Sequence, residues 1–598
     1  MRFCRISIVF IFATLLAYSS WSNAPVWHEP AQLLTGLNIW KFGRFDTQTV
    51  NPPLVRAIAS LPVLALSPNH DKSKFDRPPT GRDEFHLSSV FLEENSSKAR
   101  LLFFVGRLAC LVFAIVGVFF CYRFAKELFG AVSGIIVLLV VCFSPFILGH
   151  GATIMNDVPT AFMAVIALYF FWKWLKRPEM LEVIIAGIIL GLAVLTKFTL
   201  LIFYPFFFIL WLLYRLPDYQ SLKFKEIARQ LGSLCIIYIV SMFVINCGYI
   251  GNGTFTSLDS FRFKSLALTG KTDLEAIPYD GANRFEGTLL GKLPVPLPKD
   301  MVQGIDLQKL DFERGLPSYL RGEWSDHGWW YYYLYALLIK TPLGTLGLLL
   351  LAIYCTFFTK ECNASWRDEM VILLPGIALL VFVSFQTGFS VHSRYVIPAL
   401  PFFFIWISKV GRAISWKRPA LSTIVVTLLL WSVAGSLWVY PHSISYFNGL
   451  AAVLPTPKDA DYPKPPETPK GLKDRARKLL DAGSLNGPRH LLDSNIDWGQ
   501  DLFYLEQWCR ANPDVTELKV AYSGSYPLES TKIPSVAMPP ANVPQPGWYA
   551  LSVNYLYDRE KQYRYFLNFE PVARAGYSIY IYHLTQEDVE RLRNHSIE

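Results

Sequence analysis

Long apolar runs bounded by charged residues recur along this chain, and they restrict its fold more than any other feature. A helix needs roughly 20 apolar residues to cross a hydrocarbon core of ~30 Å. Eleven runs come close to this length, near residues 6–21, 101–121, 128–148, 158–175, 181–197, 198–214, 231–250, 334–358, 369–387, 395–408 and 420–439. The sequence therefore predicts an α-helical polytopic membrane protein with about eleven transmembrane helices.

The first run is short and follows Arg2 and Arg5, so a cleaved signal peptide is an alternative for it. We expect a retained span, because no clear small-x-small cleavage site follows the run. Only 17% of the 598 residues are charged, against about 25% in an ordinary soluble domain. That composition argues against a soluble enzyme and against a disordered chain.

Lysine and arginine are distributed unevenly between alternate connections of the predicted spans. With the N-terminus inside, the inside segments are rich in both residues, whereas the short outside connections carry only Lys197 and Arg394. This is the positive-inside bias. It explains the net charge of +9 without a nucleic-acid partner, and it predicts that the C-terminus lies outside.

Three long segments then lie outside: 22–100, 251–333 and 440–598. We expect residues 1–439 to form the membrane module, with the first two segments as its outer loops. A Pro/Lys-rich linker at 455–470 opens the third segment. Alternating and aromatic-rich stretches then predict strands at 489–493, 518–522, 548–555 and 577–584, and a helix at 500–510. The segment 440–598 is therefore expected to be a small extracytoplasmic α/β domain.

Acidic and imidazole side chains mark two outer positions. His28 and Glu29 follow the first span, and Glu29 is close to a helix start, where capping is the simpler explanation of a carboxylate. Asp157 is at the outer mouth of the fourth span, with no basic neighbour in the sequence. Ionisable groups at membrane depth are costly and usually face a cavity or a partner. We therefore take His28, Glu29 and Asp157 as candidate catalytic residues.

Three isolated cations are predicted at a similar depth: Arg107, Lys197 and Arg394. Each alone could extend to lipid phosphate. Together they suit one buried anion, because outward-facing cations are otherwise scarce in the short connections. Candidate substrate contacts nearby are Asn51, Arg56, Glu323 and His392.

Cations beside a carboxylate are suited to one kind of reaction. The cations would stabilise a departing phosphate, and the carboxylate would deprotonate an acceptor hydroxyl. This is the equipment for moving a sugar from a lipid phosphate. The sequence has no Walker loop or dinucleotide fingerprint to support a soluble nucleotide donor. The nine cysteines show no paired spacing, so no zinc site or disulfide framework is indicated.

At these residues the chain resembles the bacterial branch of the dolichyl-phosphate-mannose–protein mannosyltransferase family. That family belongs to the GT-C superfamily, and lipid A aminoarabinose transferases are in the same group. The resemblance runs through most of the chain. Its motifs are His28-Glu29-Pro30, Gly43-Arg44-Phe45, Asn51-Pro52-Pro53-Leu54, Asn156-Asp157-Val158-Pro159, Gly191 to Lys197, Arg394-Tyr395 with Pro398 and Pro401, Ser445-Tyr446-Phe447-Asn448 and Leu492 to Asp501.

The resemblance implies an inverting transfer from a polyprenyl-phosphate sugar, with an acidic pair in the first outer loop. Glu29 matches the second member of that pair, and His28 replaces the Asp usually assigned as the base. Asp157 matches the acidic position of the next outer loop. Arg107 resembles the arginine that contacts the donor phosphate.

The resemblance also bears on cofactor, acceptor and location. Aminoarabinose transferases have an acidic residue and a Lys before Pro-Pro-Leu, whereas this chain has Val50 and Asn51. The metal site of that branch is therefore not supported, and a divalent cation remains an open cofactor. The implied acceptor is a protein, lipid or glycan. The implied location is a bacterial inner membrane, with the active site outside.

We therefore expect a mannosyltransferase-like enzyme that moves a hexose or pentose to an acceptor hydroxyl on the outer face. Two other classes remain open. His28 favours a weakened relative that binds a lipid-linked sugar without transferring it. A transporter of lipid-linked precursors is the second, although no paired inverted halves of the usual transporter kind are visible.

Overall fold

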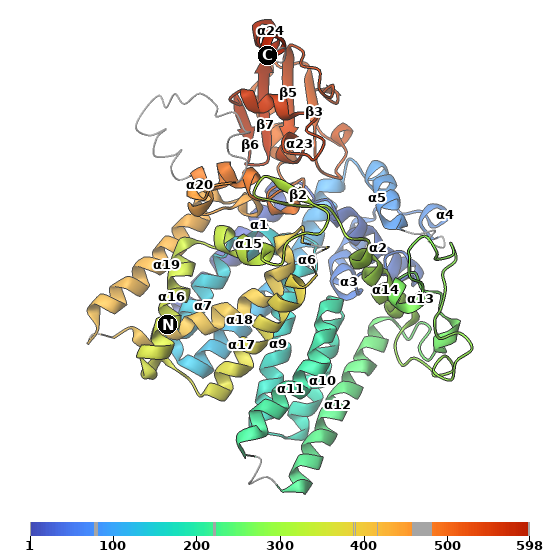
Figure 1. Cartoon of the computed structure of the whole chain (residues 1–598), viewed down its shortest axis with the longest axis vertical. Coiled ribbons are helices and arrows are strands. Elements are labelled where there is room, and N and C mark those ends of the chain that lie inside the picture. Colours follow the sequence, from blue (N-terminus) through green and yellow to red (C-terminus); the bar gives the residue numbers. More distant parts are fainter. Residues whose placement is uncertain are drawn as a thin grey trace.

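The computed structural model describes residues 2–76, 82–218, 223–386, 388, 390–415, 417–456 and 481–595. The chain is mostly helical, and a small sheet lies near its C-terminus (Figure 1). Most of the expected linker, residues 457–470, falls outside the described residues.

Seven helical segments of the described chain are long and apolar enough to cross a membrane. They include α1 (Arg2–Ser22), α6 (Ala99–Phe129), α9 (Asp157–Lys176), α12 (Phe224–Gly248) and α19 (Pro419–Val439). The other two are built around α11 (Phe203–Arg215) and α18 (Leu400–Ile407), each extended by 3₁₀ turns. By length and composition, this is the architecture of an integral membrane protein.

Two further spans form only if a bent pair of helices is counted as one. α7 (Ala131–Cys142) and α8 (Pro145–Gly151) meet at 58°, and α15 (Tyr332–Lys340) and α16 (Leu343–Phe358) meet at 112°. A proline lies at each break, Pro145 and Pro342. Proline lacks the N–H that a continuing helix needs, and it restricts the residue before it. The two prolines therefore explain why each pair of helices is bent.

Eleven spans were expected, and seven to nine helices or bent pairs of the described chain are long and apolar enough to cross a membrane. Helices occupy the other two expected spans. α10 (Met180–Val194) has 15 residues and is therefore only ~22 Å long, short for a full crossing. α17 (Trp366–Ser384) carries Arg367, Asp368 and Glu369 in its first turn.

Two glycines allow close packing of α10 against α12. Gly187 and Gly191 of α10 face α12, where a Cβ atom on either would lie 2.7 Å from Val240 Cβ or Val244 Cβ. Small residues four apart are the usual way to bring two membrane helices together. α10 ends at Val194, so this contact also fixes the turn that carries Lys197.

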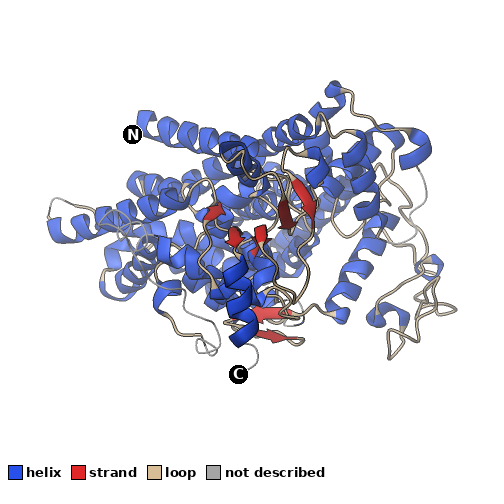
Figure 2. Ribbon diagram, turned by 90° about the horizontal axis from the view of Figure 1, so that it is seen from above, coloured by secondary structure: helices blue, strands red, loops and turns tan. Residues whose placement is uncertain are grey.

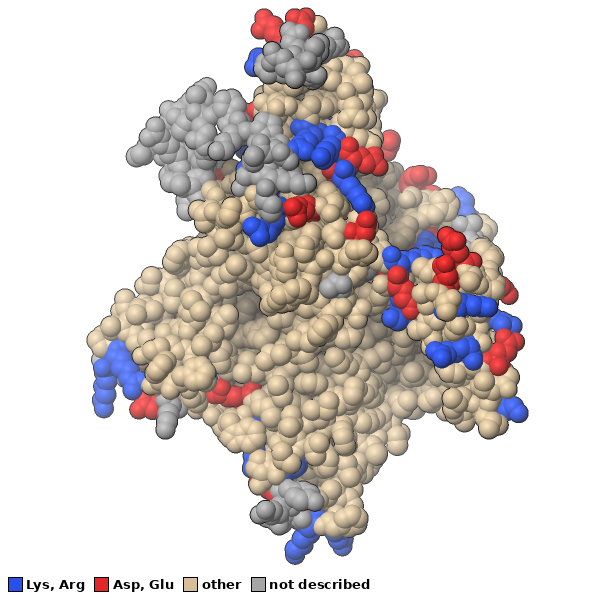
Figure 3. Space-filling model, viewed as in Figure 1, with Lys and Arg blue, Asp and Glu red and all other residues tan. Residues whose placement is uncertain are grey.

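Short elements cover the upper ends of the membrane helices (Figure 1). The first outer loop contributes α2 (Glu29–Phe42), α3 (Leu54–Ser60) and α5 (Asp83–Glu94). The second contributes α13 (Leu266–Thr269), α14 (Lys299–Arg314) and the antiparallel pair β1 (Ser318–Leu320) and β2 (Glu323–Ser325). Charged side chains gather on the upper part and at the lower tips of the face in Figure 3, and a wide band between them is uncharged.

The C-terminal region, residues 481–595, holds a five-stranded sheet above this layer (Figures 1 and 2). Its strand order is β4-β3-β5-β7-β6: β4 (Ser535–Ala537), β3 (Leu518–Ala521), β5 (Gly547–Ser552), β7 (Ile579–Leu584) and β6 (Ala573–Ala575). β3 runs parallel to β4 and β5, and β7 runs antiparallel to β5 and β6. Its helices include α22 (Leu502–Ala511), α23 (Val553–Leu556) and α24 (Gln586–His595).

The α/β character of this region is as expected, and β3, β5, β7 and α22 lie where the alternation and residue content predicted them. The expected strand at 489–493 is wrong. Single 3₁₀ turns lie there instead, at Gly487–Arg489 and Asp493–Asn495. Asp493 has φ of +58°, a left-handed conformation that interrupts any strand.

Candidate functional site

A cavity lies between the membrane helices and the outer loops. Its empty volume is about 1040 Å³, counted with the open space at its mouth. Its walls come from the first outer loop, the start of α9, the turn before the 3₁₀ segment Phe198–Ile202, the 3₁₀ segment Ser393–Ala399, α14 and α17. Four of the residues predicted as catalytic or phosphate-binding line it: His28, Asp157, Lys197 and Arg394.

Asp157 is the centre of an ion cluster in this cavity. It is the first residue of α9, where the helix dipole favours a carboxylate. Its Oδ1 accepts a hydrogen bond from Lys197 Nζ at 2.6 Å, and its Oδ2 lies 3.6 Å from Arg394 Nη1. All three residues are at most 7% exposed. The cluster therefore holds two positive charges and one negative charge, with a surplus cation facing the cavity.

Asp157 Oδ2 accepts no hydrogen bond from the described residues, although the atom is buried. A buried carboxylate oxygen without a donor is costly. The oxygen is therefore available to a donor that enters the cavity, such as a hydroxyl group of a ligand.

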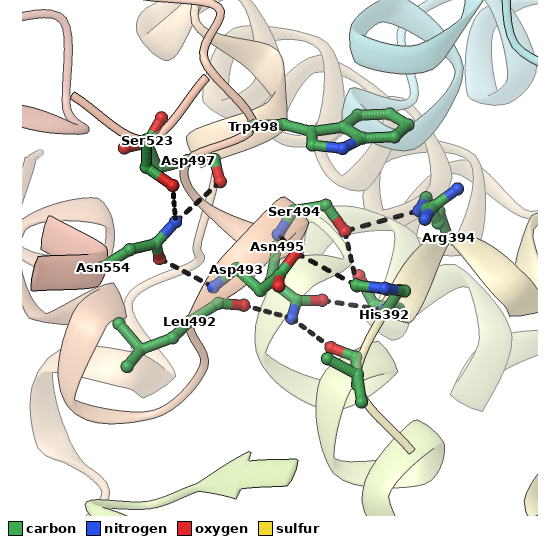
Figure 4. Close-up of polar contacts among 12 residues, drawn as sticks. His392, Arg394, Leu492, Asp493, Ser494, Asn495, Asp497, Trp498, Ser523 and Asn554 are labelled. Atoms are coloured by element: carbon green, nitrogen blue, oxygen red, sulfur yellow. Dashed lines mark hydrogen bonds and ion pairs between the residues drawn. The ribbon is translucent and has the colours of Figure 1, made fainter. Parts of the chain in front are cut away.

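Arg394 is held by contacts with a distant part of the chain (Figure 4). Its Nε donates to Ser494 Oγ at 3.4 Å, and its Cζ lies 4.3 Å from the centre of the Trp498 ring. Tyr395 supplies a second ring at 5.1 Å. A guanidinium has five N–H donors, so donors remain for a ligand in the cavity.

His28 lines the cavity from the start of α2. Its ring lies 5.7 Å from that of Trp498 and 5.6 Å from that of Phe85, and its Nδ1 is buried without a hydrogen-bond partner among the described residues. Burial, with Arg394 and His392 nearby, lowers the pKa of His28 to about 3. The imidazole is therefore neutral at physiological pH, and it is a weak base.

Glu29, the third candidate catalytic residue, is not among the residues that line the cavity. Its carboxylate is fully buried and accepts four hydrogen bonds. Two come from Arg107, at 2.8 Å from Nε and 2.5 Å from Nη2. The other two come from the backbone N–H groups of Ile154, at 2.7 Å, and Val26, at 2.8 Å.

Arg107 also lies outside the cavity lining. Besides binding Glu29, it donates to the backbone carbonyls of Ser20 and Asn23, both at 2.8 Å, and of Ala24, at 3.0 Å. All five N–H donors are thereby used. The pair joins α6 to the end of α1 and to the residues before α9. Removing one partner of such a buried pair typically costs about 3–5 kcal/mol of stability.

The four predicted substrate contacts separate into two groups. Asn51 lines the cavity. Arg56 does not line the cavity itself. Its Nη1 donates to the carbonyl and side-chain oxygens of Gln48, a lining residue, at 2.6 and 3.0 Å. His392 also does not line the cavity, and its Nδ1 lies 2.8 Å from Ser494 Oγ. Glu323 belongs to β2 and does not line the cavity.

Sequence reasoning missed several residues of the cavity and its surroundings. Gln32 donates to Asn156 Oδ1 at 3.2 Å, and both line the cavity. Gln32 could have been found, because it is one helical turn after His28 and shares its face. Ser494 and Trp498 belong to the motif Leu492 to Asp501, but their place beside Arg394 could not be predicted, because about 100 residues separate them from it in the sequence.

The divalent cation considered from the sequence has no ligand set here. Within the described ranges, no group of three or more His, Cys, Asp or Glu side chains is placed to hold a metal ion.

Among solved structures, the chain is similar to ArnT from Cupriavidus metallidurans bound to undecaprenyl phosphate, with a TM-score of 0.46 and 11% identity over 96% of this chain and 97% of that one. It is also similar to the Archaeoglobus fulgidus oligosaccharyltransferase in its apo form, with a TM-score of 0.41 and 12% identity over 81% of this chain and 64% of that one. No curated protein matches the sequence.

The family comparison is more specific. Residues 101–245 match the family described as dolichyl-phosphate-mannose-protein mannosyltransferase. This segment runs from α6 into α12 and contains both Asp157 and Lys197. The match agrees with the resemblance in the motifs, and it covers residues 101–245 of the 598.

Proposed function

We propose that this protein is a membrane glycosyltransferase that moves a sugar from a polyprenyl-phosphate donor to an acceptor hydroxyl in the cavity. One observation carries the proposal: a buried carboxylate, Asp157, is flanked by Lys197 and Arg394 and has one oxygen free of hydrogen bonds. The family match over residues 101–245 supports the choice of a lipid-phosphate donor.

Lys197 and Arg394 would bind the donor phosphate. Arginine can hold a phosphate through two parallel N–H bonds, while lysine acts more as a point charge. When the bond between the sugar C1 and the phosphate oxygen breaks, the leaving polyprenyl phosphate gains negative charge. Cations already in place stabilise that charge without reorganisation.

Asp157 would act as the general base. The acceptor oxygen forms a bond to C1 from the face opposite the phosphate, so the configuration inverts, and the hydroxyl proton passes to Asp157 Oδ2. Its two cationic neighbours keep the carboxylate ionised before the reaction, but they also make it a weaker base. After the polyprenyl phosphate leaves, loss of the proton from Asp157 to water would restore the carboxylate between its two cations.

His28 is the second candidate for the base, because it lines the same cavity. Its imidazole is neutral, and its Nδ1 is buried without a hydrogen-bond partner among the described residues, so it can accept a hydrogen bond from a ligand. We therefore assign it a hydrogen-bonding role toward the substrate. Glu29 and Arg107 are assigned to structural support, since their hydrogen-bonding groups are used within the protein.

The cavity is lined by the outer loops and by the ends of the helices next to them, which the charge bias assigns to the outer face. We therefore propose transfer on the extracytoplasmic side of the membrane, with residues 1–439 as the membrane module and 440–598 as an extracytoplasmic domain. A bacterial inner membrane is the setting that the motif resemblance implies.

The test is turnover of a donor panel. Purified protein is incubated with polyprenyl-phosphate mannose, glucose, galactose, arabinose and aminoarabinose, together with an extract of membrane lipids and secreted proteins as acceptors. Released polyprenyl phosphate is measured. At least one donor should give acceptor-dependent release. Tight donor binding without any release would instead favour a protein that binds lipid-linked sugars.

A further inference from the structure

The residues 493–498 of the C-terminal region, here called the roof turn, lie next to Arg394 (Figure 4). Ser494 places its hydroxyl 3.4 Å from Arg394 Nε, and Trp498 places its ring 4.3 Å from Arg394 Cζ. Trp498 is 3% exposed, so this ring belongs to the interior of the protein. The roof turn therefore contacts the one cation of the site that comes from the segment before α18.

The roof turn is fastened to the body of the C-terminal region. Asn554 of α23 accepts the N–H of Asp493 at 2.8 Å and donates to the carbonyl of Asp497 at 3.1 Å. One side chain thus closes both ends of the turn. The position of Ser494 follows from the fold of the C-terminal region and not only from its neighbours in the membrane module.

The roof turn is also fastened to the membrane module. Asn495 accepts the N–H of Ser393 and donates to the carbonyl of Val391, both at 2.8 Å. Trp27 donates its N–H to the carbonyl of Trp498 at 3.0 Å. The turn therefore fixes the backbone just before Arg394 and the loop just before His28.

The charged partner of Arg394 makes no hydrogen bond with it. Asp157 Oδ2 is 3.6 Å away, beyond a hydrogen bond. An indole face attracts a guanidinium without using its N–H donors, which lie at the edge of the planar group. Stacking on Trp498 can therefore set the orientation of Arg394 and still leave its donors to the phosphate.

We propose that Ser494 and Trp498 are positioning residues that orient Arg394 toward the donor phosphate, so that the C-terminal region completes the anion site of the membrane module. This inference rests on the proposed function, because it takes Arg394 to bind that phosphate. It assigns the C-terminal region a part in donor binding that the membrane helices alone do not supply.

The test is a double-mutant cycle on the full-length protein in detergent, with undecaprenyl phosphate as the probe and its Kd as the readout. Trp498→Leu should weaken binding by about 5-fold, on the scale of a cation–π contact of ~1 kcal/mol. In an Arg394→Ala background, the same change should add less than about 2-fold, because coupled residues are not additive. Trp498→Phe keeps an aromatic face and should restore most of the affinity.

Two further variants separate positioning from general damage. Ser494→Ala removes a single hydroxyl, and it should weaken binding only when Arg394 is present. Trp508→Leu removes a half-buried tryptophan of the same region that packs on Trp548, away from the cavity, and it should leave the Kd unchanged.

The outcomes also distinguish the positioning role of Ser494 and Trp498 from the proposed binding of the donor phosphate by Arg394. If Arg394→Ala left the Kd unchanged, the anion site itself would be refuted. If Arg394→Ala weakened binding but Trp498→Leu did not, or if the two effects simply added, the positioning role alone would be overturned. Equal losses for Trp498→Leu and Trp508→Leu would overturn it as well.

Discussion

At the scale of single residues, rare ionisable groups near the membrane ends fall into two kinds of pair. Glu29 and Arg107 satisfy each other completely, and neither lines the cavity. Asp157 and Arg394 do so incompletely, at 3.6 Å, and both line it. Incomplete pairing is therefore the better mark of a site in this chain.

Lys197→Met and Arg394→Met should each weaken donor binding by about 1.5–3 kcal/mol, the scale of a hydrogen bond to a charged group. The measurement is the Kd of polyprenyl phosphate at fixed salt. Lys271→Met is the control, because it removes one positive charge from an exposed position in the second outer loop. Equal small losses of donor affinity in all three variants would show that Lys197 and Arg394 act only through the net positive charge of the protein.

The pH dependence should not follow His28. With its pKa lowered to about 3, His28 stays neutral down to that range, whereas the unfolded chain protonates it near 6.5. Its neutral burial favours the folded state above about pH 6.5, and that contribution is lost as the pH falls toward 3. The rate between pH 5 and 8 should therefore keep its profile in His28→Asn. An acid limb near pH 6.5 that vanishes in this variant would make His28 the base.

At the scale of elements, the contact of α10 with α12 positions the turn that carries Lys197. Gly191→Ala should destabilise the protein by about 1–3 kcal/mol, the usual cost of overpacking. The added Cβ would lie 2.7 Å from both the carbonyl of Ser241 and Val244 Cβ. Thermal unfolding in detergent measures this change. Gly232→Ala on α12 is the control, because a Cβ atom there would have no neighbour within 4 Å, and it should be neutral or stabilising. A similar loss of stability in this variant would contradict the packing explanation.

The sequence predicted elements well where a local pattern decides them. Apolar runs predicted the helices, and alternation predicted β5 and β7. The short strands β4 and β6, with three residues each, carry too little pattern and were missed. At the site, Asp157, Lys197 and Arg394 were predictable as rare charges at membrane depth. The partners Ser494 and Trp498 were not, because only the tertiary fold brings them to Arg394.

At the scale of the whole molecule, the lysine and arginine bias predicts which face carries the cavity. Reporter fusions after Lys176 and after Arg418 should score inside, and a fusion after Glu598 should score outside. An inside score at Glu598 would contradict the outer location of the C-terminal region. It would also move the proposed transfer reaction to the other side of the membrane.

The most direct test of the central claim compares donor binding with donor turnover in Asp157→Asn. Loss of a general base typically costs about 10²–10⁴-fold in rate. We expect this variant to release polyprenyl phosphate at least ~100-fold more slowly than the wild type. It should bind the donor equally well or better, because Lys197 and Arg394 both remain. Full turnover in Asp157→Asn would contradict the account.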